Sequence, residues 1–454
     1  MNNQPNYRSS LAVLITLFFM WGFITCLNDI LIPYLKSVFD LMHWQAMLVQ
    51  FAFFGAYFIG SLIYFIISAV HGDPINRMGY KKGIIAGLFV SASGTALFFP
   101  AAQFQSYAFF LSALFILGLG FTLLQIAANP YVAILGSPET ASGRLNLAQA
   151  FNSFGTFIAP LVGGFLIYEF FGNSPDASSV RYPYLFFSLL FLLIALLIFK
   201  SKLPRFENLE TIEKGMGALK FPQLWLGIIA IFMYVGAEVS IGSIMTAFLG
   251  LPEIAGLTHE EAPVFISLYW GGLMIGRFTG SFALGNLNQR LRYILILLIP
   301  VIAFLFIALV FHLRGFDISQ LKYYVLPLII CILAFYNGRT KPAFTLMLFA
   351  LIAVAMLITA LITDGLTAMF AVIGIGLFNS IMWSNIFSLS IHGLGKYTSQ
   401  GSSLLVMAIL GGALVPPLQG YAADLHGVHQ SFIIPLVCYA YLIFYGWRMN
   451  RRRV

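Results

Sequence analysis

The stretch LAVLITLFFMWGFITCLNDILIPYLK, residues 11–36, decides the class of fold. It holds two charged residues, Asp29 and Lys36, in an otherwise largely apolar run. A helix needs about 20 apolar residues to cross the hydrocarbon core of a bilayer. The run does not alternate with the period of two that a membrane β-strand requires. It therefore predicts a transmembrane α-helix.

The rest of the chain has the same composition. Of its 454 residues, 60% are hydrophobic and 9% are charged, whereas about a quarter of a soluble domain is charged. The net charge of +8 falls mainly in short loops, so it indicates membrane topology and not a nucleic-acid partner. Each of the three cysteines, Cys26, Cys331 and Cys438, lies inside an apolar run, which predicts small buried side chains and not a disulfide or metal framework.

Apolar runs of spanning length recur along the whole chain, so we expect an all-α polytopic membrane protein. The predicted segments are about fourteen: residues 10–36, 45–70, 82–101, 106–135, 145–171, 183–200, 222–249, 262–285, 291–312, 321–336, 342–362, 366–392, 399–424 and 430–447.

Lysine and arginine concentrate in alternate loops, and such loops are normally cytoplasmic. The exceptions in the opposite loops are Lys36, Arg181, Arg314 and Lys322. This pattern predicts a multi-pass protein of the cell inner (plasma) membrane with both termini in the cytoplasm. The basic residues on the predicted cytoplasmic side are Arg8, Arg77, Lys81, Lys82, Arg144, Lys200, Lys202, Arg205, Lys214, Lys220, Arg290, Arg292, Arg339, Lys341, Lys396, Arg448, Arg451, Arg452 and Arg453.

The longest charged segment, residues 201–221, predicts a cytoplasmic linker between an N-terminal six-helix bundle, residues 1–200, and a C-terminal bundle, residues 222–454. The two parts share a local pattern. GDPINRMGYKKG, residues 72–83, and GGLMIGRFTG, residues 271–280, place glycine and a basic side chain at the end of the second helix of each part. Related halves around a central site are the plan of many secondary transporters.

Three longer stretches carry a resemblance to a known family. They are FFMWGFITCLNDILIPYLK at 18–36, LLQIAANPYVAILG with RLNLAQAFNSFGTFIAP at 123–136 and 144–160, and SIMWSNIFSLSIHGLGKYTSQGSSLLVMAILGGALVPPLQGYAAD at 380–424. Together with the loop at 72–83, they resemble the major facilitator superfamily and, within it, the fucose–galactose–glucose cation symporters. The glucose/galactose permease branch is the most similar. The resemblance implies a monosaccharide importer that works by cation symport and alternating access.

The family fold has two six-helix halves, and this chain has two apolar segments more. LYWGGLMIGRFTGSFALGN, residues 268–286, matches the family's eighth helix, and KPAFTLMLFALIAVAMLI, residues 341–358, matches its ninth. The extra pair therefore lies at about 287–338 in the second half. We expect it to pack on the outside of the bundle, and its short second segment allows a tilted or re-entrant piece as an alternative.

Ionisable side chains within the hydrocarbon region are costly and are functional candidates. Asp29 is one, and it is either an interfacial acid in water or the cation-coupling group. A carboxylate shielded from water can exchange a proton near neutral pH, and it could equally bind Na⁺ with nearby oxygens. The family resemblance assigns the coupling role to Asp29, and it leaves H⁺ and Na⁺ open as the coupling ion.

Glu238 is the second intramembrane acid, in the middle of its predicted helix. It is either a buried acid paired with a neighbour or a group for sugar binding or coupling. The resemblance to the fucose-specific members shows a swap of two side chains. Those members have a glutamate where this chain has Gln125, and a glutamine where this chain has Glu238. They also have an asparagine in place of Cys26, which argues against L-fucose as the substrate.

A sugar is bound by hydrogen bonds to its hydroxyls and by aromatic faces against its ring. Amides at helical spacing provide the candidates, although such amides also hold helices together. Trp383, with Asn379 one turn earlier on the same face, matches a sugar-packing tyrosine of the fucose branch, and Trp21, Tyr57 and Trp270 are weaker aromatic candidates. The predicted sugar-binding set is Asn28, Gln125, Asn129, Asn146, Gln149, Asn152, Glu238, Asn379 and Trp383.

Other classes of function are less well supported. The sequence contains no HExxH, GxSxG or GxxxxGK[ST] motif, so neither a membrane-embedded enzyme nor an ATP-driven pump is indicated. We expect no enzymatic activity, no bound cofactor and a monomeric carrier, with a channel as the remaining alternative. Glucose, galactose, mannose, fucose and N-acetylhexosamines all remain possible substrates.

Overall fold

A computed structural model describes residues 8–71, 74–135, 141–170, 177–201, 203–204, 217–283, 288–338, 341–394 and 398–451. Within these ranges the secondary structure is helical and contains no strand. Most of the predicted linker at 201–221 lies outside the described residues. So do residue 287 and the basic residues Lys202, Arg205, Lys214, Arg339, Lys396, Arg452 and Arg453.

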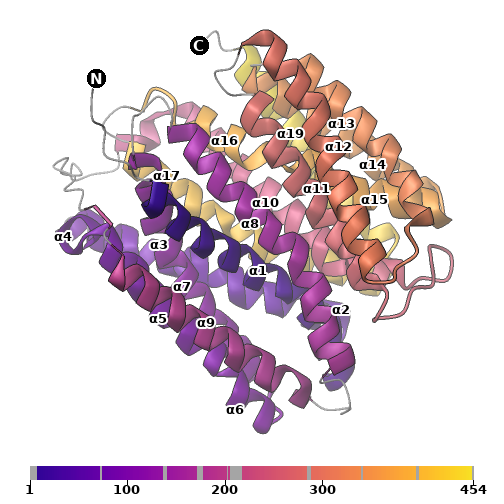
Figure 1. The fold of residues 1–454 in the computed structure, drawn as a ribbon, viewed down its shortest axis with the longest axis horizontal. Helices are drawn as coiled ribbons and strands as arrows, with labels where there is room; N and C mark the ends of the chain where they lie inside the picture. The colour runs from indigo at the N-terminus through magenta and orange to yellow at the C-terminus, as the bar shows by residue number, and fades with distance from the viewer. Residues whose placement is uncertain are drawn as a thin grey trace.

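The first part of the chain forms the helices that lie on one side of the molecule in Figure 1. Several spanning segments are built from two consecutive elements, because a proline or a turn interrupts the regular hydrogen bonding. The elements are α1 (Arg8–Phe39), α2 (His43–Ala46), α3 (Leu48–His71), α4 (Pro74–Met78), α5 (Tyr80–Ala96), α6 (Phe98–Gln103), α7 (Tyr107–Ile134), α8 (Ala141–Gly164), the π-helix η2 (Phe165–Phe170), the 3₁₀ helix η3 (Ala177–Val180) and α9 (Arg181–Lys200).

The second part forms the other side, with α8 and α10 near the middle of the view (Figure 1). Its elements are η4 (Gly217–Lys220), α10 (Pro222–Leu249), α11 (Ala262–Ala283), α12 (Gln289–Leu313), η5 (Ile318–Tyr324), α13 (Val325–Gly338), α14 (Pro342–Ile362), α15 (Gly365–Asn379), α16 (Met382–Ile391), α17 (Thr398–Met407), η7 (Ala408–Leu410), α18 (Gly411–His426), η8 (Gln430–Phe432) and α19 (Ile433–Arg451).

Thirteen helical segments among the described residues are long and apolar enough to cross a membrane. The fourteenth predicted segment corresponds to α11, a helix of 22 residues that is less apolar because it contains Arg277 and several glycines. The predicted all-α polytopic fold is confirmed. Successive spans run in opposite directions, so the chain has two faces. The terminal face is the one where α1 begins and α19 ends, and the opposite face carries the turns at 40–42, 104–106, 250–261 and 427–429.

The additional pair of helices, α12 with η5 and α13, covers the outside of the seam between α8 and α11. Phe306 of α12 packs on Phe154 and Phe157 of α8, with ring centroids 6.0 and 6.3 Å apart. Most of α12 faces away from the protein, as the 61% exposure of Ile302 illustrates. The second segment is longer than predicted, because a 3₁₀ turn from Ile318 precedes α13 and brings the span to 21 residues.

On the opposite face, the first and second parts of the chain are in contact. The carboxylate of Asp424, at the end of α18, accepts hydrogen bonds from the backbone N–H groups of His43 and Trp44 at 3.1 and 3.0 Å. The Ser267 hydroxyl of α11 donates to the backbone carbonyl of Phe157 on α8. The structure therefore represents a conformation in which this face is closed.

Glycines allow α1 and α8 to approach each other at backbone distance. A Cβ atom on Gly22 would lie 2.0 Å from the Asn152 carbonyl oxygen, and one on Gly155 would lie 2.1 Å from the Phe19 carbonyl oxygen. Helices in lipid gain little from the hydrophobic effect when they associate, so close van der Waals packing between small residues provides much of the attraction. These two glycines set the distance between α1, which carries Asp29, and α8, which carries Gln149.

We predict that Gly155→Ala destabilises the protein by about 1–3 kcal/mol, the usual cost of an overpacked interior position. The expected result is a lower melting temperature of the purified protein in detergent, measured by intrinsic fluorescence. Gly55→Ala is the matched control, because a Cβ atom there meets nothing within 4 Å. Equal melting temperatures for the two variants would contradict the assigned role of the α1–α8 contact.

Candidate functional site

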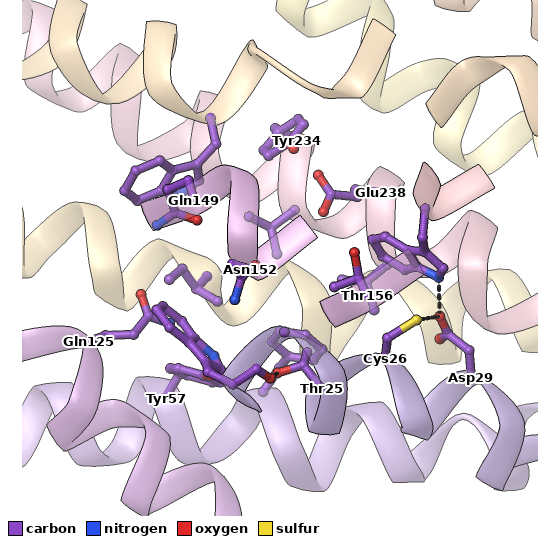
Figure 2. Close-up of a pocket in the computed structure, with 18 of the residues that line it drawn as sticks. Thr25, Cys26, Asp29, Tyr57, Gln125, Gln149, Asn152, Thr156, Tyr234 and Glu238 are labelled. Carbon is purple, nitrogen blue, oxygen red and sulfur yellow. Dashed lines mark hydrogen bonds between the residues drawn. The ribbon is translucent and has the colours of Figure 1, made fainter. Parts of the chain in front are cut away.

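A cavity lies between the two parts of the chain, at the centre of the bundle (Figure 2). Its walls come from α1, α3, α7 and α8 on one side and from α10, α11, α16 and η7 on the other. Aromatic side chains provide much of the surface: Trp21, Phe54, Tyr57, Tyr234, Trp270 and Trp383. Three ionisable side chains, Asp29, Glu238 and Arg277, also line it.

Asp29 lies at one end of the cavity and is 2% exposed (Figure 2). Its Oδ2 accepts a hydrogen bond from the Trp270 indole N–H at 2.8 Å and a longer one from the Cys26 thiol at 3.7 Å. Its Oδ1 accepts from the Gln50 amide at 3.2 Å. That amide nitrogen also donates to the Ser243 hydroxyl at 2.9 Å. The Ser243 hydroxyl also hydrogen-bonds the carboxylate, which is thus surrounded by donors from α1, α3, α10 and α11.

Glu238 projects into the middle of the cavity from α10 (Figure 2). Its Oε2 atom is buried and has no hydrogen-bond partner among the described residues. Arg277 of α11 is close enough for its positive charge to act on Glu238. The guanidinium Nη1 donates to the Ser153 hydroxyl of α8 at 2.6 Å, and Nε donates to the Ser380 carbonyl at 3.3 Å.

The end of the cavity away from Asp29 is formed by Tyr57 and Gln125 (Figure 2). The Tyr57 hydroxyl accepts a hydrogen bond from the Trp21 indole at 3.3 Å and also bonds with the Gln125 amide. Gln125 is 7% exposed. The two aromatic residues that the sequence indicated only weakly, Trp21 and Tyr57, therefore line the cavity together with a predicted sugar-binding amide.

The predicted amide side chains of α8 differ in their hydrogen-bond partners. Gln149 lines it and donates from Nε2 to the Asn129 Oδ1 at 3.5 Å. Asn152 also lines it, but its Nδ2 donates to the Phe18 carbonyl of α1 at 3.0 Å. Asn152 thus holds two helices together, the alternative considered for it from the sequence. The side chain of the predicted Asn146 lies outside the part of the structure that is described.

Asn379 and Trp383 do not share a helix face as the sequence spacing predicted. Helix α15 ends at Asn379 and α16 begins at Met382, so the chain turns between them. Trp383 lines the cavity and stacks on Phe387 with ring centroids 5.0 Å apart. Asn379 is fully buried outside the cavity lining, where its amide bonds the hydroxyls of Tyr269 and Tyr439 at 2.9 and 2.7 Å.

Two further predicted residues, Asn28 and Asn129, are not part of the cavity wall. Asn28 is 1% exposed, and its Nδ2 has no hydrogen-bond partner among the described residues. Asn129 reaches the cavity only through its contact with Gln149. Helical spacing placed these amides on plausible faces, but it could not fix the rotation of each helix relative to the cavity.

Several residues of the cavity wall were not identified from the sequence, and Gln50 and Arg277 are the two whose polar contacts matter most. Arg277 lies inside a predicted span, so the rule that singled out Asp29 and Glu238 applies to it as well. The stretch 271–280 was instead compared with the first part of the chain as a glycine-rich helix end that precedes the loop with Arg290 and Arg292. Gln50 is an amide in an otherwise apolar run, and only its distance to Asp29 and Ser243 reveals its importance.

The described residues contain no group of three or more histidine, cysteine, aspartate or glutamate side chains that could hold a metal ion. Around Asp29 the polar neighbours present N–H, S–H and O–H groups to the carboxylate, the last from Ser243. Such donors satisfy a carboxylate, whereas Na⁺ would need several oxygen ligands. The three cysteines are free and buried, as predicted.

Residues 10–338 match the model of the Major Facilitator Superfamily, and the chain belongs to that family of membrane transporters. It is 45% identical over 451 residues to a Brucella abortus protein named glucose/galactose transporter, covering 98% of this chain and 95% of the relative. It is 31% identical over 472 residues to the Escherichia coli L-fucose-proton symporter, with 97% and 93% of the two chains covered. The predicted family membership is confirmed.

A solved structure is similar over almost the whole length. The crystal structure of the superfamily transporter FucP in the outward conformation superposes with a TM-score of 0.67 at 30% identity. The comparison covers 98% of this chain and 99% of that chain. The cavity between the two parts of the chain therefore lies in a transporter fold.

We predict that Asn379→Ala lowers the melting temperature, because the Tyr439 hydroxyl loses its acceptor and the Tyr269 hydroxyl loses a donor. Removing one partner of a buried hydrogen bond costs about 1–3 kcal/mol. Thermal unfolding in detergent measures the effect, with Asn337→Ala on the exposed side of α13 as the control. A variant with unchanged stability and a weakened apparent affinity for sugar would instead place Asn379 in the binding site.

Proposed function

We propose that this chain is a secondary active transporter that imports a neutral hexose, of the glucose or galactose type, together with a proton. The observation that carries the proposal is the central cavity, which combines two intramembrane carboxylates with amide and aromatic side chains. The family relatives named as sugar transporters and as a sugar-proton symporter support this assignment. Binding of sugar and proton on one face and release of both on the other would follow from rocking of the two parts of the chain around the cavity.

The cavity has the chemistry that a monosaccharide needs. Hydroxyl groups pair with amide side chains and with acceptors that have free lone pairs, and the apolar face of a sugar ring packs on aromatic rings. Gln125 and Gln149 provide amides, Trp21 and Trp383 provide rings, and the unpartnered Oε2 of Glu238 provides an acceptor. Glu238 is thus proposed as a sugar-binding residue, with a second coupling charge as the alternative role.

The surroundings of Asp29 favour a proton over Na⁺ as the coupling ion. Hard cations bind through oxygen ligands, and Asp29 is contacted by the indole of Trp270, the thiol of Cys26 and the amide nitrogen of Gln50. These groups donate hydrogen to the carboxylate in this arrangement. The neighbouring side-chain oxygens are the Ser243 hydroxyl and Gln50 Oε1, fewer than the about six or more oxygen ligands of a typical hard-cation site. A buried carboxylate with such neighbours can hold or release a proton without rebuilding a coordination shell.

We also propose how the protein is oriented in the membrane. The terminal face carries most of the basic residues, so we place it in the cytoplasm and the opposite face outside the inner (plasma) membrane. The basic linker at 201–221 then lies inside, between the proposed six-helix N-terminal bundle and the C-terminal bundle with its inserted pair.

The first test is uptake of labelled glucose, galactose, mannose, fucose and N-acetylglucosamine into proteoliposomes. We expect a gradient with acid outside to drive accumulation of glucose or galactose, and an equal sodium gradient to have no effect. Collapse of the proton gradient with a protonophore should abolish accumulation while leaving exchange measurable. Accumulation driven only by sodium would contradict the proposed coupling ion, and transport of none of the sugars would contradict the substrate class.

We predict that Asp29→Asn reduces proton-driven accumulation at least tenfold, because the amide cannot carry the coupled proton. Counterflow of labelled sugar should persist, since exchange needs no net proton movement. Asp40→Asn is the control, because Asp40 is exposed at the end of α1 and its positive φ of 50° is compatible with asparagine. Wild-type accumulation by Asp29→Asn would remove Asp29 from the mechanism.

We predict that Glu238→Gln weakens apparent sugar affinity in counterflow about tenfold and preserves the dependence of accumulation on the proton gradient. The reason is that the amide keeps the shape but loses the charged acceptor, and a hydrogen bond to a charged group contributes about 1.5–3 kcal/mol. The measurement is the sugar concentration at half-maximal counterflow. A variant with wild-type affinity and no accumulation would assign Glu238 to coupling instead.

A further inference from the structure

We infer that Trp270 is a positioning residue for proton coupling, and that its indole N–H promotes release of the Asp29 proton when the opposite face closes. The inference rests on the proposed function, because it assumes that Asp29 carries the coupled proton. In the closed conformation the Trp270 indole, on the second part of the chain, donates a hydrogen bond to Asp29 on the first part.

The contact joins the two parts of the chain directly. Asp29 belongs to α1, Trp270 belongs to α11, and the indole nitrogen lies 2.8 Å from Oδ2. This is the shortest hydrogen bond recorded for the carboxylate, since the Gln50 and Cys26 contacts are 3.2 and 3.7 Å long. Gln50 comes from the same part of the chain as Asp29, and it reaches the second part through the Ser243 hydroxyl.

The Trp270 contact depends on closure of the opposite face. Ser267, one helical turn before Trp270, donates to the Phe157 carbonyl of α8. Pro263, about one turn earlier, packs against Gly164, where a Cβ atom would lie 3.0 Å from the proline ring. Opening this face must separate α11 from α8 at these positions, and the same movement withdraws the indole from Asp29.

The local packing fixes the indole in its donating position. Trp270 is 7% exposed, and its ring meets the ring of Tyr269 at 74° with centroids 5.1 Å apart. Gly242 of α10 provides the space for both partners: a Cβ atom there would lie 3.0 Å from the Trp270 Cζ2 and 3.1 Å from the Asp29 Oδ2. A larger residue at position 242 would therefore push the two groups apart.

The chemistry of the indole determines which protonation state of Asp29 the contact favours. An indole N–H donates and cannot accept the O–H of the acid. Its hydrogen bond to the charged carboxylate is roughly twice as strong as one to a neutral acid, so it favours the deprotonated form. In the open conformation Asp29 would bind a proton from outside water. When the face closes, the arriving N–H occupies Oδ2, the O–H bond of the acid breaks, and the proton passes to water in the cavity while the electron pair stays on the carboxylate.

Other titratable groups near Asp29 also affect the equilibrium between its protonated and charged forms. Cys26 faces it from α1, Glu238 acts on it from α10, and Tyr269 acts on it from α11. The thiol and the phenol are neutral near pH 7, and a charged Glu238 repels charge on Asp29.

Two donors to Asp29 belong to the other part of the chain, Trp270 of α11 and the Ser243 hydroxyl of α10. Trp270 lies on the helix that contacts α8 through Ser267, so it links protonation to closure of the opposite face.

The test compares Trp270→Phe with wild type in proteoliposomes at internal pH 6.5 to 8.5 and a fixed external pH. The readout is proton-driven accumulation divided by counterflow of the same variant, which removes any general loss of transport. We expect the internal pH that supports half-maximal accumulation to rise by about one unit, the size expected for one hydrogen bond to a charged group. Raising the internal pH should then restore accumulation. Trp225→Phe is the matched control, because Trp225 is also an indole donor, to the Leu219 carbonyl, and it is 48% exposed.

The outcomes separate the inference from the proposed function. A wild-type protein that does not respond to a proton gradient overturns the proposed function. A responsive wild type with an unshifted Trp270→Phe profile overturns the inference alone. If Trp270→Phe does not fold, Gly242→Ala serves instead, because it displaces the indole from Asp29 and keeps the tryptophan. We expect the same shift for Gly242→Ala, and a wild-type profile for that variant overturns the inference.

Discussion

The carboxylate of Asp29 imposes the constraint on which the arrangement of the two parts of the chain depends. A carboxyl group in the middle of a bilayer cannot be solvated by lipid, so the protein must supply its hydrogen-bond donors. One part of the chain provides Gln50 and Cys26, and the other provides Trp270 and Ser243. Contact between the two parts therefore adds donors to those that the first part already gives the acid.

Close helix packing makes that contact possible. The hydrophobic effect does not draw helices together in lipid, so contact at backbone distance must hold the bundle. Gly22 and Gly155 give α1 and α8 this contact, and Gly242 gives α10 access to the pair of Asp29 and Trp270. The same small residues that hold the helices together thus determine how precisely the polar groups of the cavity meet.

The sequence predicted the fold well because one physical requirement, the thickness of the bilayer, fixes the length of each apolar run. The spans at 222–249 and 342–362 were predicted with the bounds that α10 and α14 have. The site was less predictable. Arg277 was considered only as part of a glycine-rich helix end, and the turn after Asn379 has neither glycine nor proline to mark it. Asn379 was consequently predicted to bind sugar, whereas its amide hydrogen-bonds the hydroxyls of two tyrosines in the structure.

Asp29 and Glu238 line the same cavity but differ in their hydrogen-bond partners, and this difference is the basis for their different proposed roles. Asp29 is surrounded by protein donors, so any change of conformation that removes a donor changes the energy of its charge. Glu238 has an oxygen without a protein partner among the described residues, so a ligand hydroxyl would gain a full hydrogen bond there. A single acid with both properties would bind sugar and proton at one point and would make them compete. Two acids on α1 and α10 let both bind at once, which symport requires.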